Sequence, residues 1–288
     1  MQKASLKPEL DRLYEAFNRE DAAADPVQFV HRYREVADRE IVAFAASALA
    51  FGRVASVLAS VERLLALMGS SPARFVRTFV PREVMDAFAG LGHRWTRGED
   101  LVALLLVLRH MVDCAGSLER YVADDHDPEA RDITDAVERF SARACAVDVR
   151  EVYGKSVPRQ GVRFFFPRPS SGSACKRLNL FLRWMVRSDA VDPGGWTMIR
   201  PAQLVVPLDT HVIRVGRCLG LTRYRSPGWR MAVDITASLR RLDPRDPVRY
   251  DFSLCHLGMM GACGFGTNRS NQRCPLRAFC RPRDGVTA

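Results

Sequence analysis

The sequence predicts an all-α protein. Apolar residues recur at helical spacing through nearly every segment of the chain, and the Gly, Pro and Ser clusters fall between these segments. Only the run 162–166 has a strand-like composition, and it leads directly into a Pro-rich turn. The 288 residues are enough for two modest domains or one large one.

Helix boundaries can be placed from capping residues in the first half of the chain. Asp25 followed by Pro26 gives an N-cap and a proline at the first helical position, and Asp38 is expected to cap the next helix. Gly52 is expected to interrupt that helix before the following one begins. The helices predicted in this half cover 8–17, 26–36, 39–50, 53–68, 81–91, 99–114 and 131–153.

The second half is predicted to contain helices over 174–187, 210–219, 227–241 and 247–261. Linker-like composition occurs at 124–130, 154–173 and 188–207. The last two linkers flank the 174–187 helix, so this helix and the one after it both begin directly after a loop.

The chain is basic, with a net charge of +10 and a pI near 9.6. A basic, Arg-rich protein typically binds a polyanion such as nucleic acid, although an Arg-rich composition without such a partner gives the same charge. The longest apolar run, 41–52, is too short to span a bilayer, and the first ten residues lack the apolar core of a secretory signal. We therefore expect a cytoplasmic, nucleoid-associated monomer that does not bind membranes.

Lys176 is a candidate nucleophile. The chain has four lysines against thirty-nine arginines, and arginine cannot lose its proton near neutral pH to serve as an amine nucleophile. A lysine attacks only as the free amine, and burial, the positive end of a helix dipole and a neighbouring cation such as Arg177 all favour that form. The alternative is a surface lysine without a chemical role.

Asp209 is the candidate partner of Lys176. It precedes the 210–219 helix, where free backbone N–H groups stabilise a carboxylate. An amine beside an anionic carboxylate suits attack at a sugar C1′, since the carboxylate stabilises the oxocarbenium-like centre while the amine captures it as a Schiff base. Taken alone, however, Asp209 is better interpreted as a plain N-cap.

These residues resemble the helix-hairpin-helix DNA glycosylase superfamily, which includes endonuclease III and the 8-oxoguanine glycosylases. The match is carried by Lys176 after a turn and by V-P-L-D-T-H-V-I-R-V around Asp209. The resemblance implies that Lys176 is the nucleophile and Asp209 its essential partner. The segment 38–53 is similar to an early endonuclease III helix whose following loop enters DNA, which places Phe51 and Arg53 near that loop.

The likeness is greatest to an uncharacterised bacterial family, over roughly residues 8 to 262, with further similarity to archaeal 8-oxoguanine glycosylases. It implies two helical lobes, one from 1–40 plus 190–288 and one from 41–189, with DNA between them. Two departures stand out. The hairpin reads P-R-P-S-S-G-S (167–173) where the superfamily has L-P-G-V-G, and the segment 188–203 lengthens the spacing between Lys176 and Asp209.

Four cysteines crowd the C-terminus. Cys263, Cys274 and Cys280 resemble the first, third and fourth ligands of the endonuclease III iron–sulfur tail, while Asn271 stands near the second position. Cys255 lies about two helical turns before Cys263 and could supply the fourth thiolate of a [4Fe-4S] cluster. A zinc site that uses His256, or cysteines without any metal, are the alternatives.

Three further residues are candidates for the base pocket or for DNA contact. Trp196, in the 188–203 segment, could stack on an extruded base, while His211 could either line the pocket or cap its helix. Arg177, next to Lys176, could contact DNA. Asp246 and Asp251 are expected to serve helix capping and ion pairing.

The predicted function is a DNA base-excision glycosylase with AP-lyase activity that acts on double-stranded DNA containing a damaged base, such as an oxidised purine. A non-catalytic DNA-binding protein on the same fold is the rival interpretation. Oxidised pyrimidines or alkylated bases are alternative substrates.

Overall fold

The prediction of an all-α fold is confirmed. The structure, a computed structural model, describes residues 5–19, 25–124, 126–260 and 274–280. It is 60% helical and 2% strand. The helices are α1 (Leu6–Phe17), α2 (Gln28–His31), α3 (Val36–Ala48), α4 (Val54–Met68), α5 (Pro72–Thr78), α6 (Pro81–Ala89), α7 (Gly98–Ala115), α8 (Leu118–Ala123), α9 (Thr134–Ala146), α10 (Arg150–Tyr153), α11 (Gln160–Arg163), α12 (Lys176–Val186), α13 (Thr210–Cys218), α14 (Trp229–Arg240) and α15 (Asp251–Met259).

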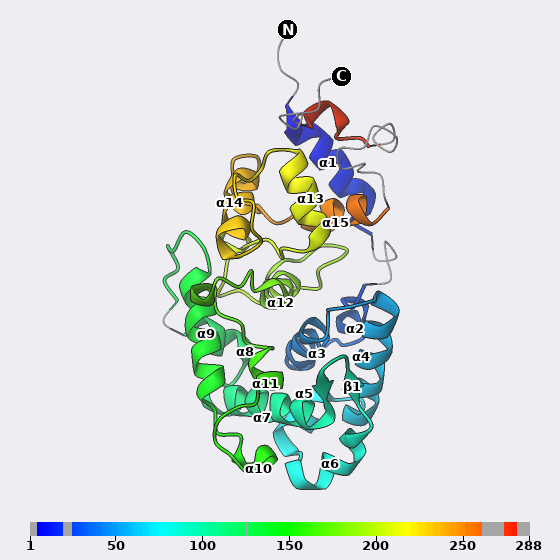
Figure 1. Ribbon diagram of the computed structural model, residues 1–288, viewed down its shortest axis with the longest axis vertical. Coiled ribbons are helices and arrows are strands. Elements are labelled where there is room, and N and C mark those ends of the chain that lie inside the picture. The colour runs from blue at the N-terminus through cyan, green and yellow to red at the C-terminus, as the bar shows by residue number, and fades with distance from the viewer. Residues whose placement is uncertain (1–4, 20–24, 125, 261–273, 281–288) are drawn as a thin grey trace.

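A small antiparallel hairpin, β1 (Gly92–His93) with β2 (Thr96–Arg97), precedes α7, and 3-10 turns occur at Pro169–Ser171, Pro201–Gln203 and Arg277–Phe279. In Figure 1, α1, α13, α14 and α15 gather at one end of the molecule, and α4 to α10 form the opposite end. Helix α12 lies between these groups and packs against α3, while α15 packs against both α13 and α1.

Helices α3 and α7 form the centre of the larger group because both are apolar on every side. All residues from Glu40 to Ala48 and from Asp100 to Leu108 are buried, as is typical of helices enclosed by others. No described helix is by itself long and apolar enough to cross a membrane; by length and composition only the pair α4 and α5 qualifies, and it is bent by 62°.

Several local predictions are confirmed and others are wrong. Helix α3 ends at Ala48, and Gly52, with φ +99°, separates it from α4 as predicted. The run 162–166 is not a strand: it ends α11 and forms a turn in which Phe165 and Phe166 enter the core. Asp38 does not cap α3, because that helix begins at Val36; instead the Oδ1 oxygen of Asp38 accepts the Ala73 N–H at 2.8 Å.

Two of the predicted helices are interrupted. The segment 26–36 contains only α2 and the start of α3, and 131–153 is divided into α9 and α10. Asp148 lies at the second break, where its carboxylate accepts the N–H of Arg150, the first residue of α10, at 3.0 Å.

Candidate active site

Lys176 begins helix α12, as predicted. The turn before it ends in Cys175, a buried residue held in the left-handed region (φ 48°) that redirects the chain into the helix. The Lys176 side chain is half-buried, and its Nζ amine donates to the carbonyl oxygen of Ala50 at 3.4 Å. The first residue of α12 is therefore joined to the loop between α3 and α4.

Asp209 is the N-cap of α13, and this prediction too is confirmed. Its Oδ1 oxygen accepts the Val212 N–H at 2.7 Å. The five residues before it, Leu204 to Leu208, are all buried, so the chain enters the helix from the core. The second carboxylate oxygen, Oδ2, accepts a hydrogen bond from the Cys255 thiol of α15 at 2.9 Å.

Lys176 and Asp209 line one cavity of about 130 Å³. Its walls come from five parts of the chain: the segment before α2, the α3–α4 loop with the start of α4, helix α12, the segment before α13, and helix α15. The lining residues are Asp25, Pro26, Ala50, Gly52, Val54, Val57, Lys176, Leu180, Arg183, Pro207, Asp209, Asp251, Phe252, Cys255, His256 and Met259. The fold thus brings the predicted nucleophile and its predicted partner to the same cavity.

Asp251 forms part of the cavity wall and is almost fully buried. Its Oδ2 oxygen accepts from the Arg183 guanidinium at 2.5 Å, while Oδ1 has no hydrogen-bond partner within the described residues. Burial raises the pKa of Asp251 to about 7; the neighbouring Asp209 carboxylate adds to this rise and Arg183 opposes it. The wall therefore carries a carboxyl group that can hold a proton near neutral pH.

A buried ion-pair network supports this wall, as expected for Asp246 and Asp251. Arg183 also donates to Asp192 at 3.1 Å, and Arg187 contacts Asp189, Asp192 and Asp246. Asp189 and Asp192 belong to the segment 188–203, which lengthens the spacing between Lys176 and Asp209. That segment thus supplies counter-charges for α12.

Trp196 does not lie at the cavity. It is 4% exposed, its indole N–H donates to Glu40 at 2.8 Å, and its ring packs edge-on against Phe181 at 5.1 Å between centroids. The Glu40 carboxylate also accepts the N–H groups of Leu118 and Glu119 at the start of α8. This position does not fit the predicted stacking of Trp196 on an extruded base, because both ring and N–H are used inside the fold.

Arg177 does not fit the predicted DNA contact either. It is buried, and its guanidinium donates to the carbonyl oxygens of Ala48, at 2.9 Å, and Phe164. The guanidinium carbon lies 3.6 Å from the centre of the Phe164 ring and 5.3 Å from that of Phe51. Arg177 therefore holds the α3–α4 loop against the turn that follows α11.

The remaining DNA-contact candidates lie around the cavity without lining it. Phe51 is half-buried between Ala50 and Gly52, which do line it, and Arg53 is exposed at the N-cap of α4. His211 faces α15, where a Cβ placed on Gly258 would lie 2.7 Å from the His211 Cβ. His211 therefore packs between α13 and α15.

The structure describes three of the four predicted metal ligands. Cys255 donates to Asp209, and the Cys280 Sγ lies 2.8 Å from the Sγ of Cys218, while Cys263 lies outside the described residues. Cys274 is buried, and the Nδ1 of His256 is within 2.9 Å of the Phe252 carbonyl oxygen. No three His, Cys, Asp or Glu side chains in the described part of the chain gather as metal ligands. The cluster stays a prediction.

Cys255 and Asp251 are cavity residues that the sequence interpretation assigned elsewhere. They are four residues apart on α15 and so share one face of that helix. This spacing is the signal that could have placed them together, but it does not say that the shared face meets Asp209.

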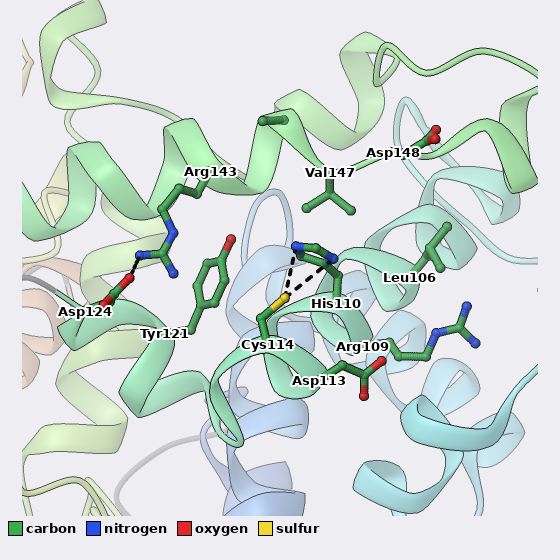
Figure 2. A pocket seen from close by; sticks show the side chains of 11 residues that line it. Leu106, Arg109, His110, Asp113, Cys114, Tyr121, Asp124, Arg143, Val147 and Asp148 are labelled. Atoms are coloured by element: carbon green, nitrogen blue, oxygen red, sulfur yellow. Dashed lines mark hydrogen bonds and ion pairs between the residues drawn. The ribbon is translucent and has the colours of Figure 1, made fainter.

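A more open hollow of about 680 Å³ lies between α7, α8 and α9 (Figure 2). Its polar groups contact one another: Arg143 pairs with Asp124 and lies 3.8 Å from the centre of the Tyr121 ring, and Cys114 Sγ is 3.5 Å from His110 Nε2. It holds no lysine, so the Lys176–Asp209 cavity remains the candidate active site.

Comparison with family models identifies the family of this chain. Residues 25–260 match the model described as "Protein of unknown function (DUF2400)". The chain belongs to this family. The matched region of the DUF2400 protein includes Lys176, Asp209, Asp251 and Cys255 and ends before the C-terminal cysteines. Searches of curated proteins and of solved structures give no match.

Proposed function

We propose that this DUF2400 protein is a DNA glycosylase with AP-lyase activity. The observation that carries the proposal is the shared cavity of Lys176 and Asp209, the pair that the resemblance to helix-hairpin-helix glycosylases singles out. A cavity of roughly 150 Å³ holds a single aromatic ring, and the volume here is about 130 Å³. The cavity thus corresponds in volume to about one six-membered ring, the size of a pyrimidine base.

The proposed reaction begins when the C1′–N bond breaks and its electron pair leaves with the base, which takes up a proton. The Asp209 carboxylate stabilises the positive charge that develops at C1′. The Lys176 amine then forms the Nζ–C1′ bond and loses a proton, and cleavage of the C1′–O4′ bond gives the Schiff base. Proton loss from C2′ expels the 3′ phosphate, and water finally releases Lys176.

Borohydride trapping tests the proposal. Reduction during reaction with a duplex that contains an abasic site should join the wild-type protein to DNA, and Lys176→Gln should not be joined. Lys155→Gln is the matched control, because Lys155 is exposed and does not line the cavity. Equal trapping of wild type and Lys176→Gln would show that Lys176 is not the nucleophile.

The rival is a DNA-binding protein without catalysis. It would bind duplex DNA with a steep salt dependence, since exposed arginines release counter-ions from phosphates, yet yield no trapped adduct. A screen of duplexes that each carry one oxidised purine, oxidised pyrimidine or alkylated base identifies the lesion. A flat dependence of affinity on salt would remove both DNA-binding interpretations.

The iron–sulfur cluster is proposed only for the C-terminal tail. Protein purified without oxygen should then contain iron and sulfide, whereas stoichiometric zinc would favour the Cys/His alternative. If protein made under iron-replete conditions contains neither metal, the cysteines bind no metal.

A further inference from the structure

Trp95 is the most exposed large aromatic side chain among the described residues. It is 54% exposed at the tip of the β1–β2 hairpin, whereas Trp184, Trp196 and Trp229, the other three tryptophans, are 0%, 4% and 7% exposed. Leaving so much indole in water sacrifices the free energy that burial would provide. A role at the surface would explain the exposure.

The Trp95 ring is held in place by two phenylalanines. It stacks on Phe51 at 5.0 Å between centroids with an interplanar angle of 30°, and meets the edge of Phe164 at 5.1 Å. His93, in the same hairpin, lies with its Nε2 2.7 Å from the Phe51 carbonyl oxygen. Beneath both phenylalanine rings lies the buried guanidinium of Arg177. The exposed face of Trp95 is thus the outer layer of a fixed stack.

This stack adjoins the Lys176 cavity. Phe51 lies between Ala50, whose carbonyl oxygen accepts from Lys176, and Gly52, which lines the cavity. The hairpin touches the same loop, since a Cβ placed on Gly52 would lie 3.0 Å from the Arg94 Nη1. The aromatic stack is therefore joined directly to the cavity wall, because Phe51 is bonded to two residues that line the cavity.

The surroundings of Trp95 are basic. Arg53, Arg94 and Arg97 are exposed near the stack, and none of them forms an ion pair with a described residue. The Arg94 guanidinium carbon lies 5.6 Å from the centre of the Trp95 ring. An exposed aromatic ring beside unneutralised arginines is the combination that binds unstacked nucleobases together with their phosphates. A protein partner that docks through apolar contacts would instead favour apolar residues around Trp95.

We propose that Trp95 stacks on a nucleobase of the DNA at the mouth of the Lys176 cavity. The inference rests on the proposed function only in requiring that the protein binds DNA; it requires no catalysis. Base–aromatic stacking is tolerant of sequence, so Trp95 adds affinity for an unstacked or unpaired site without selecting the lesion. Arg53 and Arg94 hold the adjacent phosphates.

Tryptophan fluorescence provides a direct test. The probe is a duplex that carries one tetrahydrofuran abasic analogue, which has no aldehyde and so cannot form a Schiff base. Binding is measured by anisotropy of labelled DNA and, separately, by the intrinsic emission of the protein. Because only Trp95 is accessible, the wild-type emission should be quenched in step with binding, and Trp95→Phe should bind with most of the quenching lost.

Substitution separates stacking from charge. Trp95→Ala should weaken binding roughly 5- to 150-fold with an unchanged salt slope, whereas Arg94→Ala should lower that slope by about 1. Met198→Ala is the matched control, since Met198 is 49% exposed and does not line the cavity. It should bind like the wild type.

The outcomes distinguish this inference from the proposed function. DNA binding without quenching, together with wild-type affinity of Trp95→Ala, would overturn the role of Trp95 and leave the glycosylase proposal intact. Absence of any DNA binding would overturn both. If Trp95→Ala fails to fold, the Trp95→Phe fluorescence decides, because phenylalanine preserves the packing against Phe51.

Discussion

The thiol of Cys255 donates a hydrogen bond to the Asp209 carboxylate, with 2.9 Å between Sγ and Oδ2. The Val212 N–H holds the other carboxylate oxygen at 2.7 Å. The Asp209 side chain is thus fixed from both sides, once by its own helix and once by α15. A carboxylate fixed in this way is suited to stabilising a cationic centre, because it needs little reorganisation during reaction.

Replacing Asp209 by asparagine should abolish base excision and leave DNA binding largely intact. Asparagine caps helices as well as aspartate does, so α13 should persist while the negative charge is lost. We expect excision in single-turnover assays to fall by at least 100-fold, in the range seen when one group that stabilises transition-state charge is removed.

Asp148→Asn is the matched control for Asp209→Asn, because the Asp148 carboxylate also accepts a backbone N–H at the start of a helix and lies outside the cavity. It should excise at the wild-type rate. Near-wild-type excision by Asp209→Asn would mean that Asp209 is only a helix cap.

Cys255 should react slowly with iodoacetamide. Burial raises the pKa of its thiol, and the Asp209 and Asp251 carboxylates raise it further, so little thiolate is present at neutral pH. Cys114 is exposed on α7 and should be alkylated first. Peptide mass spectrometry of metal-free protein at pH 7.5 reports the order, and alkylation of Cys255 before Cys114 would contradict the buried hydrogen bond.

The buried ion pairs of Arg183 should contribute substantially to the free energy of unfolding. Arg183→Met leaves the buried carboxylates of Asp192 and Asp251 without one of their cations, a change that typically costs about 3–5 kcal/mol of unfolding free energy. Arg32→Met removes an exposed pair with Glu62 and should cost about 0–1 kcal/mol. Urea unfolding measures both, and equal losses would show that the buried network is energetically unimportant.

The sequence predicts what is encoded locally. The helical class, the break at Gly52, the start of α12 at Lys176 and the cap at Asp209 follow from apolar periodicity, glycine and capping chemistry over a few residues. The meeting of Lys176 and Asp209 in one cavity comes from the resemblance, since no local pattern specifies it.

Long-range packing is what the sequence did not reveal. The Trp196 indole donates a hydrogen bond to Glu40, which lies 156 positions earlier in the chain. The Cys255 thiol donates to Asp209, which lies 46 positions earlier. Arg177 becomes a core residue only because Ala48, Phe51 and Phe164 converge on it. An arginine beside a candidate nucleophile is interpreted as a DNA-contacting residue unless these distant partners are known.

The stability of the folded protein should depend on pH through Asp251. Its pKa rises from 3.8 to about 7 on folding, chiefly because it is buried. The folded state therefore binds more protons than the unfolded state between these values, and the contribution of Asp251 to the free energy of unfolding, complete below pH 4, is lost as pH rises to about 7. The groups that face Asp251 are Arg183, Asp192 and Asp209, and they modulate the size of this loss.

Asp251→Asn tests this dependence, because asparagine resembles the protonated carboxyl in shape and cannot ionise. The difference in unfolding free energy between variant and wild type should move in favour of the variant from pH 4 to pH 7 and then become constant. Asp246→Asn is a comparison from the same network: Asp246 contacts Arg187 and is more exposed than Asp251, so the shift should be smaller. A difference between Asp251→Asn and wild type that does not change with pH would show that Asp251 remains ionised throughout, held by Arg183.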